Sequence, residues 1–193
     1  MNKLLDVTIK ELDRVGLAQV DVDTVLRKAR ISKGSLYHHF QSKNGLLAAA
    51  EAEQFMRTLR HDSEMIYRLI EECKTKQDFV DLIATVMKIT SLKENYEFRK
   101  QRIRAIAMSV NDENLALILK TAQTALSIHL ATSFQIAKDR SWLKEDLDVL
   151  ALSNWIQGVF IGHIMLDITG ITEYDESWNQ LSFLALQSFL TAD

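Results

Sequence analysis

The sequence contains no proline in 193 residues and only six glycines. Proline and glycine are the residues that most disfavour a helix interior, and the runs between the glycines are rich in Leu, Ala, Glu, Lys and Gln, which favour helix. The sequence therefore predicts an all-α fold. At 47% hydrophobic and 25% charged residues, the composition is that of an ordinary globular protein with one or two small domains.

Residues 22–47 constrain the fold further. A short helix with apolar residues on one face is predicted over residues 22–28, and a second one over residues 33–40, with a break of a few residues between them. Two short helices joined in this way form a helix-turn-helix, whose second helix has the size of the DNA major groove. This stretch predicts a DNA-binding segment.

The second helix has an inward face and an outward face. Leu36 and Phe40 are four residues apart and face inward. Ser32 is a suitable N-cap, and Gly34 leaves the first turn bare enough to approach a backbone closely. The candidates for contacts with base edges are the outward residues Lys33, Ser35, Tyr37, His38 and His39. Half-buried packing for the tyrosine and simple solvation for the lysine remain the alternatives.

The same stretch carries a family pattern. Residues 29–47 contain Ala-x-Ile-Ser-Lys-Gly-Ser-Leu-Tyr-His-His-Phe, followed by Ser-Lys and Leu-Leu. This pattern resembles the DNA-binding signature of the TetR (tetracycline-repressor) family, and the resemblance extends over about residues 1–47. It implies a three-helix helix-turn-helix DNA-binding domain (1–47) and a helical ligand-binding and dimerisation domain (48–193), with about nine helices in all. It also implies phosphate contacts for Tyr37 and for Lys43.

Three positions depart from the family pattern. Arg30 stands where relatives usually have glycine, and a positive φ would cost an arginine about 1 kcal/mol or more, although its side chain could contact a phosphate. Asp21 stands where many relatives have threonine, and a carboxylate caps a helix but repels DNA. Gln41 replaces the usual proline, which we expect to reduce rigidity only.

The spacing of apolar residues and the polar breaks predict nine helical segments, with Asp112 and Ser141 as caps. They are residues 2–15, 22–28, 33–40, 43–72, 76–93, 96–110, 114–138, 143–168 and 175–190.

Charge distribution and cysteine content indicate where the chain contacts phosphates and in which cellular compartment it works. Residues 1–50 hold eight Lys/Arg and five Asp/Glu, whereas the remainder carries a net charge of −6, so the basic end coincides with the helix-turn-helix. Cys73 is the only cysteine, which excludes an internal disulfide and suits a reducing cytoplasm. The longest apolar stretches contain polar residues, so neither a membrane span nor a signal peptide is expected.

The last two helices are the predicted dimer interface, an assignment that rests mostly on the resemblance. In it, Gly158-x-x-x-Gly162 would allow another helix to approach closely, and two helices from each subunit would form a two-fold symmetric four-helix bundle. The alternative is that these residues only close the monomer core. The candidates are Leu147, Leu150, Ala151, Asn154, Gly158, Ile161, Gly162, Met165, Trp178, Leu181 and Ala185.

A ligand site is expected among aromatic and isolated polar residues of the body, because small-molecule pockets are apolar with a few polar groups. The candidates are Tyr96, Arg102, Met108, His129, Trp155, Phe160 and His163. For each residue taken alone, core packing is the alternative. The sequence does not identify the inducer.

We therefore expect a homodimeric DNA-binding transcriptional regulator, a repressor of a palindromic operator in double-stranded DNA, released by a small molecule. A helical adaptor that has lost DNA binding is the alternative, because Arg30 and Asp21 depart from the pattern. An enzyme is not expected, and neither is a cofactor or a metal. His61 and Glu64 have the helical spacing of metal ligands, but an exposed helix face explains them better.

Overall fold

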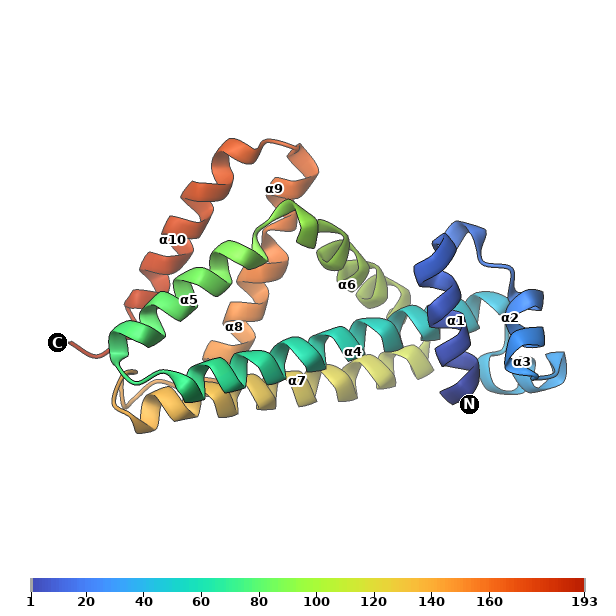
Figure 1. The fold of residues 1–193 in the computed structure, drawn as a ribbon, viewed down its shortest axis with the longest axis horizontal. Helices are drawn as coiled ribbons and strands as arrows, with labels where there is room; N and C mark the ends of the chain where they lie inside the picture. The colour runs from blue at the N-terminus through green and yellow to red at the C-terminus, as the bar shows by residue number, and fades with distance from the viewer. Residues whose placement is uncertain (1, 193) are drawn as a thin grey trace. The chain divides into compact units, whose positions relative to one another are not determined.

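The computed structural model describes the backbone of residues 2–192. Within that range it describes all side chains except those of Asn2, Phe55, Thr58, Leu59, His61, Asp62 and Asn114. The pair formed by His61 and Glu64 therefore lies partly outside the described residues. Over residues 2–192 the fold is all-α, as predicted, with ten α-helices where about nine were expected (Figure 1).

The helices have the following bounds. They are α1 (Asn2–Val15), α2 (Val22–Ala29), α3 (Lys33–Phe40), α4 (Lys43–Glu72), α5 (Lys76–Thr90), α6 (Tyr96–Ser109), α7 (Glu113–Asp139), α8 (Val149–Gly162), α9 (Ile164–Thr169) and α10 (Asp175–Gln187). Three short 3-10 helices, η1 (Leu17–Gln19), η2 (Lys93–Asn95) and η3 (Thr172–Tyr174), lie in the connections.

The chain forms two compact units, which are described separately. Unit 1 comprises Met1–Thr58 and Arg104–Thr121, and unit 2 comprises Leu59–Ile103 and Ala122–Asp193. Helix α4 begins in unit 1 and ends in unit 2 without interruption between Lys43 and Glu72.

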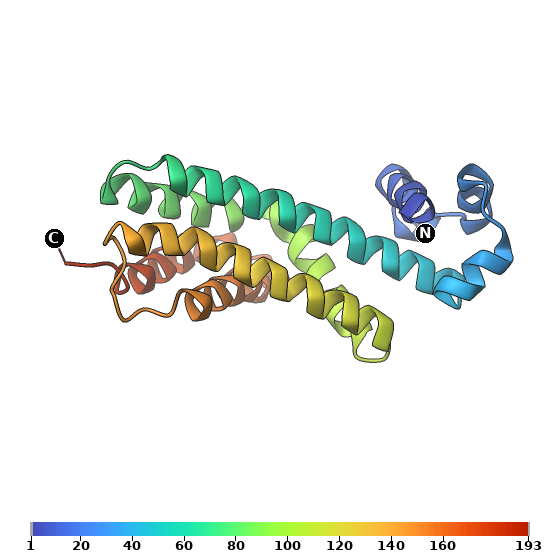
Figure 2. The ribbon, with the colours of Figure 1, turned by 90° about the horizontal axis from the view of Figure 1, so that it is seen from below.

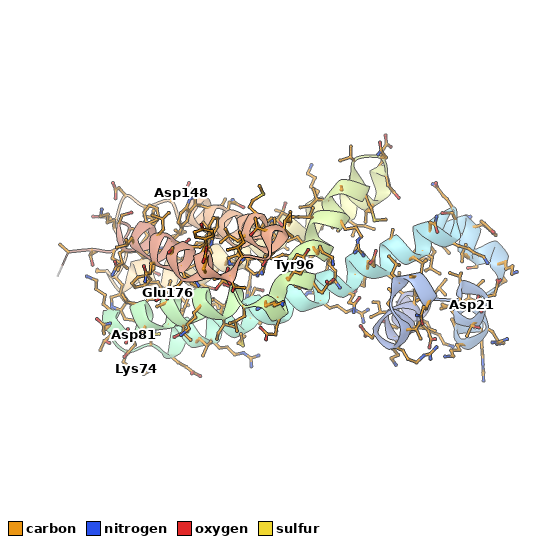
Figure 3. All side chains as sticks on the ribbon, turned by 90° about the horizontal axis from the view of Figure 1, so that it is seen from above. Asp21, Lys74, Asp81, Tyr96, Asp148 and Glu176 are labelled. Carbon is orange, nitrogen blue, oxygen red and sulfur yellow. The ribbon has the colours of Figure 1, made fainter. Side chains whose placement is uncertain are left out.

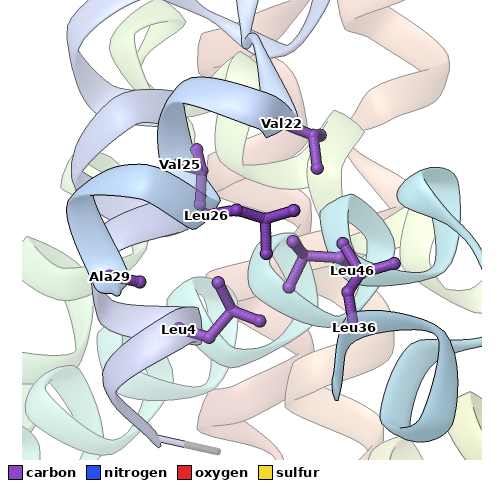
Figure 4. Close-up of a cluster of buried hydrophobic side chains, with 7 residues drawn as sticks. All are labelled: Leu4, Val22, Val25, Leu26, Ala29, Leu36 and Leu46. Carbon is purple, nitrogen blue, oxygen red and sulfur yellow. The ribbon is translucent and has the colours of Figure 1, made fainter. Parts of the chain in front are cut away.

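The core of unit 1 joins α1, α2, α3 and the start of α4 (Figure 4). The buried side chains are Leu4, Val22, Val25, Leu26, Ala29, Leu36 and Leu46. Full burial of one such leucine is worth about 2 kcal/mol, so this cluster fixes the short helices, which would not persist alone. Further along α4, Ala48 and Ala52 pack against Leu115 of α7.

A buried carboxylate links α1 to α2. Glu11 accepts hydrogen bonds from Arg14 at 2.8 Å and from Lys28 of α2 at 2.6 Å. The hydrogen bonds from these two cations, Arg14 first, lower the pKa of Glu11 from 4.5 to about 2. Glu11 is therefore a charged anchor for the helix that precedes the helix-turn-helix.

In unit 2, α7 packs along the end of α4 (Figure 2). The Tyr67 and His129 rings are 5.8 Å apart, and Nη1 of Arg140 donates to the carbonyl of Cys73 at 2.7 Å. Helix α10 packs against α5, where Nδ2 of Asn179 donates to Oγ of Ser91 at 2.7 Å. These contacts enclose an apolar interior between the helices of this unit.

One predicted helix is wrong in its extent. The segment 143–168 was expected to be continuous, but the helix begins at Val149 and breaks at His163. The carboxylate of Asp148 accepts from the N–H groups of Leu150 and Ala151 and starts α8 there, so Ser141 is not its cap. Residues 143 and 144 instead pair with the chain at 189 and 190.

Candidate nucleic-acid interface and ligand pocket

The helix-turn-helix begins at a capped α2. Asp21 lies just before α2 (Figure 3). Its carboxylate accepts from the backbone N–H groups of Asp23 and Thr24 and from the Thr24 hydroxyl at 2.6 Å. The hydroxyl of Thr24 and these N–H groups lower the pKa of Asp21 below its usual value. The cap that the sequence predicted at Asp21 is therefore present, and it places a negative charge at the start of α2.

The turn between α2 and α3 passes through Arg30, whose backbone is left-handed with φ 59° and ψ 44°. Its N–H donates to the carbonyl of Arg27, and the N–H of Ile31 donates to that of Leu26, so the left-handed residue ends the helix. This conformation costs a side chain other than glycine about 1 kcal/mol. The exposed Arg30 side chain extends from this strained turn into solvent.

Helix α3 presents a polar face. Oγ of Ser32 accepts from the N–H of Ser35 at 3.2 Å and caps the helix, while Leu36 is 1% exposed. The side chain of Tyr37 is 52% exposed. The candidates Lys33, Gly34, His38 and His39 are exposed, and Ser35 is half-buried. The residues singled out for contact with bases are thus exposed, with the exception of the half-buried Ser35.

Two lysines at helix starts share one carboxylate. Nζ of Lys33, which begins α3, lies 3.0 Å from Oδ1 of Asp23, and Nζ of Lys43, which begins α4, lies 3.0 Å from Oδ2. Hydrogen bonds from Lys33 and then Lys43 lower the pKa of Asp23, and the hydrogen bond with Asp23 raises the pKa of Lys43. Asp23 was not among the residues predicted from the sequence, although an acidic residue in a basic segment was a visible signal.

The junction between α3 and α4 requires particular backbone geometry. Gln41 has φ 60°, which proline cannot adopt. The glutamine that stands in place of the usual proline therefore changes the backbone conformation of the junction as well as its rigidity. Oγ of Ser42 accepts from the N–H of Gly45 at 2.9 Å. A Cβ at Gly45 would lie 2.1 Å from the carbonyl oxygen of Phe40, so no side chain fits there while α3 and α4 keep this approach.

Unit 2 contains a cavity of about 150 Å³. Its lining is apolar apart from a few residues, among them Arg102 and Gln157. The lining residues are Ser63, Ile66, Leu82, Ile83, Val86, Met87, Thr90, Phe98, Arg102, Leu126, Leu130, Phe134, Ile156, Gln157, Phe160 and Leu186. Of the predicted ligand residues, Arg102 and Phe160 line this cavity. The contributions of α4 and α5 were missed, because apolar helix residues give no signal that separates a cavity wall from a filled core.

A polar cluster lies at one part of this cavity. Nη2 of Arg102 donates to the amide oxygens of Gln123 and Gln157, each at 2.8 Å. The amide nitrogen of Gln157 donates to Oγ of Ser127 and to the carbonyl of Ser153, both at 3.2 Å. Burial lowers the pKa of Arg102 to about 10, so the guanidinium stays charged at neutral pH.

The other predicted ligand residues lie elsewhere. Tyr96 begins α6 (Figure 3), and Met108 is on the part of α6 that belongs to unit 1. His129 packs on Tyr67. Trp155 and His163 line a smaller cavity of about 40 Å³ beside Trp178. The larger cavity therefore does not bring the predicted set together.

His163 belongs to a buried charged cluster at the break between α8 and α9. Nδ1 of His163 lies 3.2 Å from Asp167, and the same carboxylate receives Nε of Arg99 at 2.5 Å and Nη2 at 2.7 Å. Nη1 of Arg99 donates to the carbonyl of Thr90 at 2.6 Å and so satisfies the end of α5. Helix α5 ends at this capped carbonyl, at residue 90 and not at 93 as expected.

Many residues of the predicted dimer face are exposed in the single chain. Leu150 is 44%, Met165 67% and Leu181 68% exposed. Ala151, Asn154 and Gly158 are also exposed, whereas Leu147, Ile161, Gly162, Trp178 and Ala185 are half-buried. Gly162 faces the Trp178 ring, 3.4 Å from where its Cβ would be, so this glycine serves packing within the chain.

Two segments, Leu115–Asp139 and Val149–Thr169, are long and apolar enough to cross a membrane by length and composition alone. Helices that pack against protein pass the same test. The second segment coincides with α8 and α9, which carry part of the exposed apolar face just described. In the part of the chain that the structure describes, no group of three or more His, Cys, Asp or Glu side chains could hold a metal ion.

An all-helical chain with an N-terminal helix-turn-helix is the architecture of a helix-turn-helix transcriptional regulator. Residues 4–50 match the profile of the bacterial regulatory proteins of the tetR family, so this N-terminal segment is a helix-turn-helix domain of the TetR type. BetI of Pseudomonas paraeruginosa (strain DSM 24068 / PA7), named as an HTH-type transcriptional regulator, is 31% identical over 71 residues. The alignment covers 37% of this chain and 32% of BetI, so the chain spans about a third of the length of the curated relatives it matches.

Solved structures extend the likeness in fold to the whole chain. A TetR transcription regulator from Haloarcula marismortui superposes with a TM-score of 0.64 and 13% identity, covering 98% of this chain and 97% of its own. A protein from Saccharomonospora viridis, solved in complex with choline, gives a TM-score of 0.62 and 12% identity, covering 99% and 97%. The family resemblance of residues 29–47 is thus confirmed by the profile match over residues 4–50, and the solved structures confirm the fold.

Proposed function

We propose that this chain is a DNA-binding transcriptional repressor of the cytoplasm, and that its α3 reads bases in the major groove. The observation that carries the proposal is the division of α3 into a buried side at Leu36 and an exposed side with Lys33, Tyr37 and His38. A helix held by its core on one side and polar on the other is what base reading requires. Lys43 at the start of α4 supplies a phosphate contact.

The repressor acts as a homodimer in this proposal. Leu181 and Leu184 of α10 are 68% and 62% exposed, and Met165 of α9 is 67% exposed. Large exposed apolar side chains on α9 and α10 favour burial against a second copy, through the same surface on both subunits. Two-fold symmetry then requires a palindromic operator with half-sites about 34–36 Å apart.

A small molecule releases the repressor. The cavity of unit 2 supports this step, since it is apolar with a few oriented polar groups. Ser63 and Ile66 of α4 line the cavity, and Lys43 begins the same uninterrupted helix. A ligand that favours one arrangement of α4 changes the population of DNA-competent dimers. The choline complex of the Saccharomonospora viridis relative is a precedent for a ligand in this fold.

The test is a titration of full-length protein into selected palindromic DNA and into random DNA at two salt concentrations. A repressor binds both with steep salt dependence and prefers the selected sequence by a thousandfold or more, on the order of known regulators. An adaptor that has lost DNA binding shows neither the preference nor the steep slope. That outcome would replace the proposal with its alternative.

A further inference from the structure

Two neighbouring helices have long stretches without a charged residue. No Asp, Glu, Lys or Arg occurs in residues 122–137, the part of α7 in unit 2, or in residues 149–166 of α8 and α9. Only 28% of the most apolar stretch of either helical segment is buried within the chain. The exposed surface of α5, by contrast, carries Asp78, Asp81 and Lys88. Since a solvated helix face is normally charged, packing inside the chain does not account for the composition of α7 and α8.

The exposed residues of this part of α7 lie on one side of the helix. Between residues 122 and 137 they are Thr124, Ala125, Ile128 and Thr132, which recur at helical spacing. Ile128 is 55% exposed. Oγ1 of Thr132 donates to the carbonyl of Ile128 at 3.0 Å within the same helix. This hydroxyl is therefore satisfied already, and another protein surface can cover it without leaving a donor unpaired.

Helix α8 continues the surface. Oγ of Ser127 donates to Oδ1 of Asn154 at 2.7 Å, and Oγ of Ser153 donates to the carbonyl of Ser127 at 2.9 Å, so small residues bring α7 and α8 together. Nδ2 of Asn154 donates to the carbonyl of Leu150 at 3.0 Å. The amide of this exposed asparagine thus has partners inside the chain on both its atoms. The α7–α8 face consists of the exposed residues Thr124, Ala125, Ile128, Thr132, Leu150, Ala151, Asn154 and Gly158.

Gly158 is exposed in the interior of α8, where glycine is disfavoured. A Cβ at this position would meet no atom of the described residues within 4 Å. Gly162 differs, since its Cβ would contact the Trp178 ring. Packing inside the chain therefore gives no reason for a glycine at 158, whereas the close approach of a helix from outside the chain gives one.

From these observations we propose that the α7–α8 face is a contact with a second copy of this chain. The inference rests on the homodimer of the proposed function and adds α7 to a contact carried there by α9 and α10. A stable interface uses about 20–30 residues a side, and Gly162 and Trp178 of the predicted set already pack against each other. An uncharged face with satisfied polar groups is best covered by a surface of the same kind, which a two-fold symmetric dimer supplies.

A lipid bilayer fits the face less well. Helix α8 has 14 residues and ends at His163, short of the roughly 20 that a membrane span needs. The buried ion pair of Arg99 with Asp167 lies next to this break. Exposed Asn and Thr side chains beside Leu and Ile are typical of a protein contact and disfavoured in hydrocarbon.

The experiment is analytical ultracentrifugation of the full-length chain over a concentration series. Ile128→Glu should raise the dissociation constant of the dimer by about a hundredfold or more, because symmetry places the unpaired charge in the contact twice. Ile89→Glu makes the same change at a 52% exposed isoleucine of α5 and should leave the constant unchanged. Equal effects of the two substitutions, or no effect of Ile128→Glu, would overturn the assignment.

Ala125→Glu gives a second test on the same face. It alters an exposed alanine to another good helix former, so the fold is retained, and it should raise the dissociation constant by about tenfold or more. Circular dichroism melting curves check the folding of each variant. A folded Ala125→Glu variant that dimerises like the unaltered chain would refute the contact. Flotation with phosphatidylcholine vesicles that Ile128→Glu abolishes would assign the face to a membrane and overturn the proposal.

Failure of this inference is distinguishable from failure of the proposed function. Dimers broken by Leu181→Glu and not by Ile128→Glu would retain the contact through α10 and refute the role of α7. Dimers broken by Ile128→Glu in a chain without any preferred DNA sequence would retain the α7–α8 contact and refute the repressor. A chain that binds its preferred sequence as a monomer would refute this contact and leave base reading by α3 standing.

Discussion

The Lys43 ammonium lies 3.0 Å from the Asp23 carboxylate, and this pair joins the start of α4 to α2. Lys33 donates to the other oxygen of the same carboxylate, also at 3.0 Å. In the proposed interface each of the two lysines can pair either with Asp23 or with a DNA phosphate. Asp23 therefore acts against binding by competing for cations and by repelling phosphates.

Asp23→Asn should strengthen binding to every DNA sequence by about threefold, since exposed ion pairs are individually weak. Fluorescence anisotropy at fixed salt measures the change. Asp81→Asn, an equal change of charge on α5, is the matched control and should have less effect. The same gain in both variants would mean that net charge alone, and not competition for the two lysines, is responsible.

Lys43→Ala should weaken binding to all sequences and reduce the salt slope by about 1, as expected for one phosphate contact. Lys33→Ala or His38→Ala should also change which base is preferred, by about tenfold at the affected position. Selection from a randomised operator library measures both effects, with Lys88→Ala as a control. Equal losses on every sequence for all three would contradict the assignment of base reading to α3.

Arg30→Gly should stabilise unit 1 by about 0.5–1 kcal/mol, because glycine tolerates φ 59°. Arg30→Ala removes the same side chain and keeps the strain, so it separates the backbone effect from the loss of a phosphate contact. Chemical denaturation gives the two free energies of unfolding. Equal stability of the glycine and alanine variants would refute a strained turn, and unchanged DNA affinity in both would refute the contact.

The Glu11 ion pairs should make stability pH-dependent. The pKa of Glu11 is about 2 in the fold against an ordinary 4.5, so its contribution is complete above about pH 5 and disappears as the pH falls toward 2. Glu11→Gln should therefore unfold at lower denaturant than the unaltered chain at pH 6, and the gap should close in acid. Glu145→Gln is an exposed control. A gap independent of pH would contradict the assignment.

Leu181→Glu should convert the proposed dimer to monomers, because the side chain is 68% exposed and α10 would then place a charge in the apolar contact. Sedimentation measures the state, and DNA affinity should fall with it. Ile89→Glu on α5 is the control, since Ile89 is 52% exposed. A dimer that survives the Leu181 change and not the Ile89 change would place the interface elsewhere.

The helices and caps that depend on residues close together in the sequence were predicted correctly. The spacing of apolar residues gave the bounds of α1, α3 and α4, and Asp21, Ser32 and Asp112 act as the expected caps. The family and the all-α class are likewise confirmed.

Features that depend on distant partners were not predictable in this way. At the break, the ring of the buried His163 lies 5.8 Å from the Trp178 ring on α10, and Arg99 of α6 pairs with Asp167 of α9. The pairing of residues 143 and 190, which replaces the first turns of the expected helix, joins segments that are far apart in the sequence. The cavity likewise needs gaps between six helices, and no single helix pattern records a gap. The proposed DNA and dimer residues remain predictions.

The absent side chain at Gly45 has a consequence for how a protein of this kind can evolve to recognise a different DNA sequence. The close approach of this glycine to the Phe40 carbonyl and the burial of Leu36 hold α3 in place, and the exposed pair of Lys33 with Asp23 is the only contact of its solvent-facing residues named above. Lys33 and His38 can therefore be exchanged at little cost to folding. Under the proposed function, new operators are accessible by surface substitution alone, and evolution can rewire the regulated genes while the scaffold stays constant.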